Sequence, residues 1–156
     1  MENLLRLLNP KTTNFEGVSG GSFGALTAAD VCIAMSYAKL TPIQDNLFRM
    51  KCLGANTVQN IEEFAAVLLN KIDYLLGNHN LDKKYHGAVI KVALIEFCLV
   101  SSEYKPSNRN RAMFAGVSFE TVRTLLAKHI DTIKVYFMSE FRIAEMRIES
   151  QITKAI

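Results

Sequence analysis

The chain has 156 residues, of which 49% are hydrophobic and 21% charged, and its formal net charge is +3. This length and balance suit one globular domain with a hydrophobic core and exclude a wholly disordered chain. The longest apolar run, residues 92–100, contains Glu96 and is too short to span a bilayer, so we expect no contact with the membrane. The widely spaced Cys32, Cys52 and Cys98 indicate buried free thiols in a cytoplasmic protein rather than disulfides.

The positive charge is concentrated in one segment. Residues 105–134 contain six basic and two acidic side chains, a net charge of +4, whereas the rest of the chain has 12 basic and 13 acidic side chains, a net charge of −1. We therefore expect any contact with a polyanion in this segment.

Helical periodicity and capping residues predict helices over residues 27–39, 42–53, 57–76, 81–102 and 132–153. No segment alternates as a strand would, which predicts an all-α fold, a compact multi-helix bundle. The fourth helix is apolar nearly all round and is expected at the centre. We interpret residues 1–25 as a short helix with a flexible Gly/Ser-rich arm, and residues 26–156 as a single α-helical domain.

Residues 107–128 fit a helix-turn-helix. Gly116 stands at the tight turn, where a positive φ costs glycine little. Ser118 can cap the second helix, and Glu120 suits its first turn. Small or apolar side chains are expected to pack the two helices together, with the last two facing inward: Ala112, Gly116, Val117, Val122 and Leu125.

The exposed N-terminal half of such a second helix is the part that enters the major groove of DNA. Arginine at position 123 suits a bidentate contact with guanine, and serine and threonine suit phosphates or base edges. Basic residues just before the motif are placed to neutralise phosphates. The expected DNA-binding residues are Ser118, Phe119, Thr121, Arg123, Lys105, Arg109 and Arg111. The alternative is an ordinary helical hairpin with Phe119 in the core and the arginines on a solvated face.

Several further blocks of the sequence match the pattern of a known protein family: Asn9-Pro10-Lys11, residues 26–31 with Ala34-Met35, residues 91–98 and residues 119–125. Together they resemble the late-gene transcription antitermination proteins Q of lambdoid phages. The family carries two CxxC pairs, a zinc ribbon, before its helix-turn-helix. Here residues 101–111 fill that interval and contain no cysteine, so the ribbon is absent.

The resemblance implies a protein of the host bacterial cytoplasm that binds double-stranded DNA beside a late promoter. It also implies a second partner, bacterial RNA polymerase paused with its sigma factor, which the protein modifies to read through terminators. A conventional helix-turn-helix repressor or activator, reading a palindrome as a symmetric dimer, is the alternative. A third possibility is an all-helical protein-interaction domain that binds little DNA.

We expect neither an enzyme nor a cofactor. The glycine-rich residues 17–24 lack the lysine of a phosphate-binding P-loop. His79, Asp82 and His86 are too loosely spaced for a convincing metal site, and no catalytic arrangement emerges from the spacing of other residues.

Overall fold

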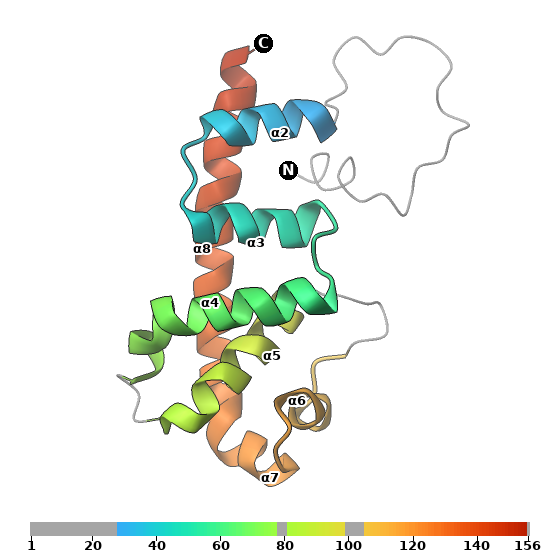
Figure 1. The fold of residues 1–156 in the computed structure, drawn as a ribbon, viewed down its shortest axis with the longest axis vertical. Helices are drawn as coiled ribbons and strands as arrows, with labels where there is room; N and C mark the ends of the chain where they lie inside the picture. Colours follow the sequence, from blue (N-terminus) through green and yellow to red (C-terminus); the bar gives the residue numbers. More distant parts are fainter. Residues whose placement is uncertain (1–27, 78–80, 99–104, 156) are drawn as a thin grey trace, which may run out of the picture. The chain divides into compact units, whose positions relative to one another are not determined.

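A computed structural model describes residues 28–77, 81–98 and 105–155 (Figure 1). Within these ranges every regular element is a helix and none is a strand, which confirms the predicted all-α class. None of the helices in these ranges has both the length and the apolar character needed to cross a bilayer. The short helix and arm predicted at residues 1–25 lie outside the described residues.

The first three described helices lie close to the predicted ranges, whereas the helix predicted over residues 81–102 begins later, at His86, and its predicted end lies outside the described residues. The first four described helices are α2 (Ala28–Tyr37), α3 (Pro42–Cys52), α4 (Val58–Gly77) and α5 (His86–Cys98), the last preceded by a 3₁₀ turn at Lys83–Tyr85. The start of α3 shows how capping residues determine where a helix begins. The Thr41 hydroxyl oxygen accepts from the Gln44 N–H at 3.3 Å, and the Gln44 side-chain oxygen accepts from the Thr41 N–H at 3.2 Å. This capping box, with proline as the first helical residue, fixes the beginning of the helix.

The last part of the chain differs from the prediction. Helix α6 (Asn108–Ala115) is followed, after a turn, by α7 (Phe119–Thr121). From α7 the chain continues without interruption through a π-helical segment (Val122–Leu126) into α8 (Ala127–Ala155). The predicted break before residue 132 is therefore wrong. The physical reason is plain, because no glycine or proline follows Gly116 and nothing in the sequence stops a helix.

Contacts between residues divide the chain into two compact units. Unit 1 consists of Met1–Ala55 and Glu140–Ile156, and unit 2 consists of Asn56–Ser139. Helix α8 thus supplies residues to both units.

The core of unit 1 is formed by α2, α3 and the part of α8 that follows Glu140. The Phe48 and Phe141 rings stack with their centroids 5.7 Å apart, and the Lys51 ammonium lies 5.2 Å from the centre of the Phe141 ring. On α2 the buried stripe is Val31, Ala34, Met35 and Ala38. Cys32 lies a quarter turn from that stripe and is exposed, so the prediction of a buried thiol is wrong there, while Cys52 and Cys98 are buried.

The core of unit 2 is organised around α5. Ten of the 13 residues of this helix are buried, so it is covered on all sides, as its apolar sequence predicts. Helix α4 packs against α5, and α5 packs against α6. From α8, Phe137 meets Phe97 of α5 edge to face at 5.9 Å. This central helix is the base on which α6 rests.

Candidate nucleic-acid interface

Helix α6 and the helical run that follows it meet at a tight turn. The Ser107 hydroxyl oxygen accepts from the Asn110 N–H at 3.1 Å and caps the start of α6. At the other end Gly116 is left-handed, with φ +66°, and the Val117 N–H donates to the Ala112 carbonyl oxygen at 3.2 Å. A left-handed residue at this position is the ordinary way to end a helix, and glycine adopts it with the least strain.

Two of the residues after the turn point into unit 2. Val122 and Leu126 are fully buried, Ala112 of α6 is buried and Val117 is half-buried. Leu125 is 39% exposed, so the prediction that it faces inward is wrong. The π segment explains the change: its hydrogen bond joins the Ala127 N–H to the Val122 carbonyl oxygen, five residues back. This wider turn rotates Leu125 away from the buried side, while Leu126 stays on the same side as Val122.

The opposite side of the same segment is turned to solvent. The Ser118 hydroxyl oxygen accepts from the Thr121 N–H at 3.1 Å, and the two hydroxyl oxygens lie 2.8 Å apart. Phe119 is 49% exposed, Thr121 is half-buried and Arg123 is exposed. The structure therefore brings four of the predicted residues together within one and a half turns of helix. Lys105 and Arg109, before and at the start of α6, are exposed as well.

Arg123 is held by its neighbour Glu120. Its Nε donates to one carboxylate oxygen at 3.1 Å and its Nη2 donates to the other at 2.7 Å. The hydrogen bonds to Glu120 raise the pKa of Arg123. These two hydrogen bonds occupy the edge of the planar guanidinium group that carries Nε and Nη2. The other edge, between Nη1 and Nη2, is therefore directed away from Glu120. That edge has the geometry for bidentate contact with a guanine base.

Arg111 corrects the sequence-based expectation. Only 7% of this residue is exposed, and its Nε and Nη2 donate to the two carboxylate oxygens of Glu96 at 2.7 and 2.8 Å. Its Nη2 also donates to Asp131 at 2.6 Å. These hydrogen bonds, first those to Glu96, raise the pKa of Arg111 against the opposing effect of burial. The prediction that Arg111 neutralises DNA phosphates is wrong, because its donors face carboxylates inside unit 2.

Sequence reasoning missed an ionic cluster built around the buried Glu96 and Arg111. This buried ionic cluster is completed toward the solvent by Lys134, which is partly exposed, and by Asp131, which is exposed. Glu96 has no exposed side-chain surface and also accepts from the Lys134 ammonium at 2.7 Å. The cluster joins α5, α6 and α8, so it fixes α6 against the other two helices in unit 2. A signal was present in the sequence: Glu96 lies in an apolar run, and a carboxylate buried there requires cations.

His86 has a structural role. It is fully buried, its Nδ1 is hydrogen-bonded to the Asp73 carboxylate, and its Nε2 lies 2.9 Å from the Leu81 carbonyl oxygen. Asp82 caps the 3₁₀ turn by accepting from the Lys84 N–H at 3.1 Å, while His79 lies outside the described residues. In the described ranges no three His, Cys, Asp or Glu residues are grouped so that they could hold a metal ion.

Unit 1 contains a buried acid and a buried thiol close to each other. Burial raises the pKa of Glu145. Burial, and then the charge of Glu145, raises the pKa of Cys52 to about 12. A thiol with so high a pKa is protonated at neutral pH, and it is a weak nucleophile because the thiolate is the reactive form.

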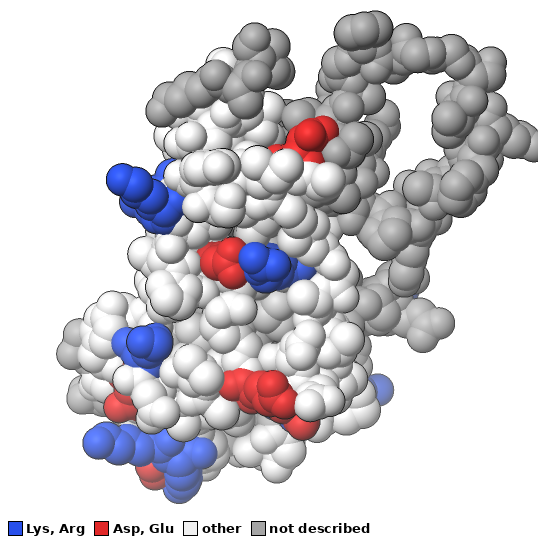
Figure 2. Space-filling view, turned by 45° about the horizontal axis from the view of Figure 1, so that its top comes forward, with Lys and Arg blue, Asp and Glu red and all other residues white. Residues whose placement is uncertain are grey.

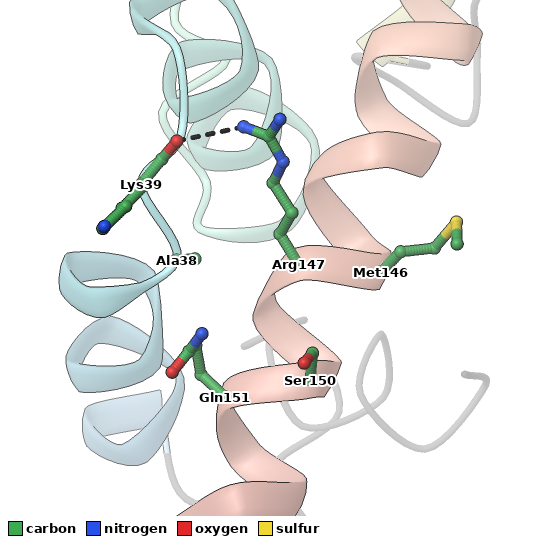
Figure 3. Close-up of a pocket in the computed structure, with 6 residues that line it drawn as sticks. All are labelled: Ala38, Lys39, Met146, Arg147, Ser150 and Gln151. Carbon is green, nitrogen blue, oxygen red and sulfur yellow. Dashed lines mark hydrogen bonds between the residues drawn. The ribbon is translucent and has the colours of Figure 1, made fainter.

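An open pocket in unit 1 offers little for chemistry. It is lined by Ala38, Lys39, Met146, Arg147, Ser150 and Gln151 (Figure 3). The Arg147 side chain points across it, and its Nη1 donates to the Lys39 carbonyl oxygen at 3.0 Å and to the Gln44 side-chain oxygen at 3.2 Å. Lys39 is left-handed at φ +50°, so Arg147 braces the strained turn between α2 and α3. The pocket lining includes no carboxylate that could pair with these cations.

Charge on the surface is spread thinly. On the face that Figure 2 shows, basic and acidic side chains of the described residues lie singly or beside one another on a mainly uncharged surface. No broad basic patch covers this face. The exposed basic residues around α6 and α7, namely Lys105, Arg109 and Arg123, are few and are suited to a small number of phosphate contacts.

No protein-family model, curated protein or solved structure matches the chain.

Proposed function

We propose that α6, the turn at Gly116 and the helical run from Phe119 form a helix-turn-helix that binds double-stranded DNA. In this proposal Arg123 contacts a guanine in the major groove, and Ser118 contacts a phosphate or a base edge. Lys105 and Arg109 approach the phosphates that flank the groove. Arg111 takes no part, since it belongs to the buried ionic cluster.

One observation carries the proposal. After a tight left-handed turn, a capped helix buries Val122 and Leu126 while its other side exposes a cation whose planar head is held in place. A recognition helix needs both properties: an apolar side that docks it on the protein, and a polar outer side on its first turns that reaches base edges.

For the biological role we propose transcription antitermination of the type found in the lambdoid Q proteins. The partners are then DNA beside a promoter and bacterial RNA polymerase with its sigma factor, in the bacterial cytoplasm. Support for this finer proposal comes from the sequence blocks that resemble the family. A zinc ribbon is absent between α5 and α6, so the short basic segment from Lys105 onward takes over the approach to DNA.

The test of DNA binding is selection from a random duplex library with the purified chain at two salt concentrations. Arg123→Ala is run in parallel, with Arg142→Ala, an exposed arginine of α8 in unit 1, as the matched control. We expect an enriched motif that Arg123→Ala loses and Arg142→Ala keeps. An asymmetric or directly repeated motif supports antitermination, and a palindrome supports a conventional repressor or activator. Absence of enrichment contradicts DNA reading and favours a protein-interaction domain.

The test of antitermination follows from that motif. A template carries the selected duplex beside a promoter and a terminator downstream, and is transcribed by bacterial RNA polymerase with its sigma factor. We expect the chain to increase the fraction of transcripts that pass the terminator, and Arg123→Ala to abolish the increase. An unchanged fraction with a tightly bound template contradicts antitermination while leaving DNA binding intact.

A further inference from the structure

We propose that Phe119 reads the 5-methyl group of a thymine within two base steps of the guanine assigned to Arg123, so that the preferred DNA site contains both bases. This inference rests on the proposed function and adds the base preference of the same surface. It concerns a residue that is neither charged nor capable of a hydrogen bond through its side chain.

The first observation is the exposure of Phe119. Half of this aromatic residue faces solvent although Val122, three residues later, is fully buried. The Ser118 cap and the hydrogen bond from the Val122 N–H to the Ser118 carbonyl oxygen, at 3.2 Å, fix the backbone on which the ring is carried. A large apolar side chain held rigidly at the surface gains free energy when a partner covers it.

The second observation is the position of Phe119 relative to Arg123. Residues four apart lie on the same side of a helix, so the ring and the guanidinium group share one outer face. The helical rise of 1.5 Å per residue separates them by about 6 Å along the axis. This distance corresponds to about two base steps of DNA, since each step rises by about 3.4 Å. The two side chains therefore address neighbouring or next-neighbouring base pairs.

The major groove of DNA presents groups that suit both side chains. In the major groove the thymine methyl group is the apolar group that the base pairs present, and phenylalanine is among the side chains that contact it. Arg123 supplies a positive charge that suits the guanine edge, and its head group is held by the carboxylate of Glu120. DNA thus offers a partner for both side chains at once, a methyl group for Phe119 and a guanine edge for Arg123.

The experiment compares thymine with uracil, which differ by this methyl group alone. Selection is carried out with two random duplex libraries, one made with thymine and one with uracil in its place. The affinity of the enriched duplex is then measured by fluorescence anisotropy in both forms. We expect one thymine position at which uracil weakens binding of the unaltered chain by about fourfold, the value of one buried methyl group.

Three variants assign that methyl contact. Phe119→Ala is expected to bind the thymine and uracil duplexes equally. Thr121→Ser, which removes a methyl group two residues from Phe119, and Tyr74→Ala, at an exposed aromatic residue of α4, are expected to keep the fourfold preference. Circular dichroism checks that Phe119→Ala keeps its helical content, as expected for a half-exposed side chain.

The outcomes separate the two proposals. If the chain enriches a motif but binds its thymine and uracil forms equally, the thymine contact is overturned and DNA binding stands. If Phe119→Ala keeps the preference for thymine, another residue makes the contact and the assignment to Phe119 is overturned. If neither library is enriched, DNA reading fails, and the thymine contact fails with it.

Discussion

Arg111 and Arg123 flank the same turn and carry the same charge, yet the fold uses them in opposite ways. Arg111 lies inside unit 2, where its guanidinium group donates to Glu96 and Asp131. Arg123 lies outside and pairs with Glu120 of its own helix. The difference teaches that an arginine near a turn is available to DNA only if the rest of the fold offers it no buried carboxylate.

The two arrangements also differ in what they contribute to stability. A carboxylate buried with its cations is costly to disturb, because removing one partner leaves charge without compensation in a poorly solvated interior. An exposed pair three residues apart is solvated, and it contributes little to stability whether or not it forms. Four predictions test this contrast, beginning with the largest effect.

Glu96→Gln is expected to reduce the free energy of unfolding by about 3 kcal/mol, because Arg111 and Lys134 lose the negative charge between them. Urea denaturation followed by circular dichroism measures the loss. Glu120→Gln is the matched control on the exposed pair and should leave the midpoint unchanged. Equal losses in the two variants would remove the distinction between the buried cluster and the surface pair.

Arg123→Ala is expected to weaken binding to the selected duplex by about tenfold while changing binding to random duplex little, as for a residue that reads a base. The thermal midpoint should stay the same, since the side chain is exposed. Fluorescence anisotropy with both duplexes measures the difference. Parallel losses on both duplexes would assign Arg123 to phosphate contact instead.

Ser118→Ala and Gly116→Ala are each expected to destabilise the chain by about 1 kcal/mol, the first through loss of the cap and the second through the left-handed backbone. Space is not the issue at Gly116, because a Cβ atom there would meet nothing within 4 Å. Urea denaturation checks both values. Gly77→Ala, with the same open surroundings but no positive φ, is the control for the glycine change. A similar loss in Gly77→Ala would mean that backbone conformation is not the cause.

Arg109→Ala is expected to have the smallest effect, a modest and even loss of affinity for all DNA sequences. The slope of log affinity against log salt should become shallower by about one, as for one phosphate contact. Titrations at several salt concentrations give the slope. An unchanged slope would show that Arg109, though exposed, does not contact a phosphate. Arg109 would then, like Arg111, have no part in DNA binding.

Local chemistry explains which parts of the fold the sequence predicts. The start of α3 follows from Thr41 and Pro42, and the turn before α7 follows from Gly116 and Ser118, because caps and left-handed glycines act over a few residues. The helical class and the central position of α5 follow from the apolar pattern in the same way.

The sequence-based predictions were wrong where the position of a side chain depends on contacts between distant residues or on a change of helical pitch. Arg111 meets partners 15 residues before it and 20 residues after it, and nothing near Arg111 in the sequence reports them. The π segment moved Leu125 outward, because hydrogen bonds five residues apart alter the spacing assumed for an α-helix. Two of the differences did have a signal in the sequence: no glycine or proline interrupts the helix before residue 132, and Glu96 in its apolar run requires cations.

The division of unit 1 between the two ends of the described chain sets an order for folding during synthesis. Unit 2 is contiguous, so its core can close once Ser139 has left the ribosome. Helices α2 and α3 are made earlier, but Phe141, which stacks on Phe48, follows unit 2 in the chain. The Phe48 ring therefore gains this partner only after all of unit 2 has been synthesised, and apolar surface left uncovered in such intermediates is what chaperones cover.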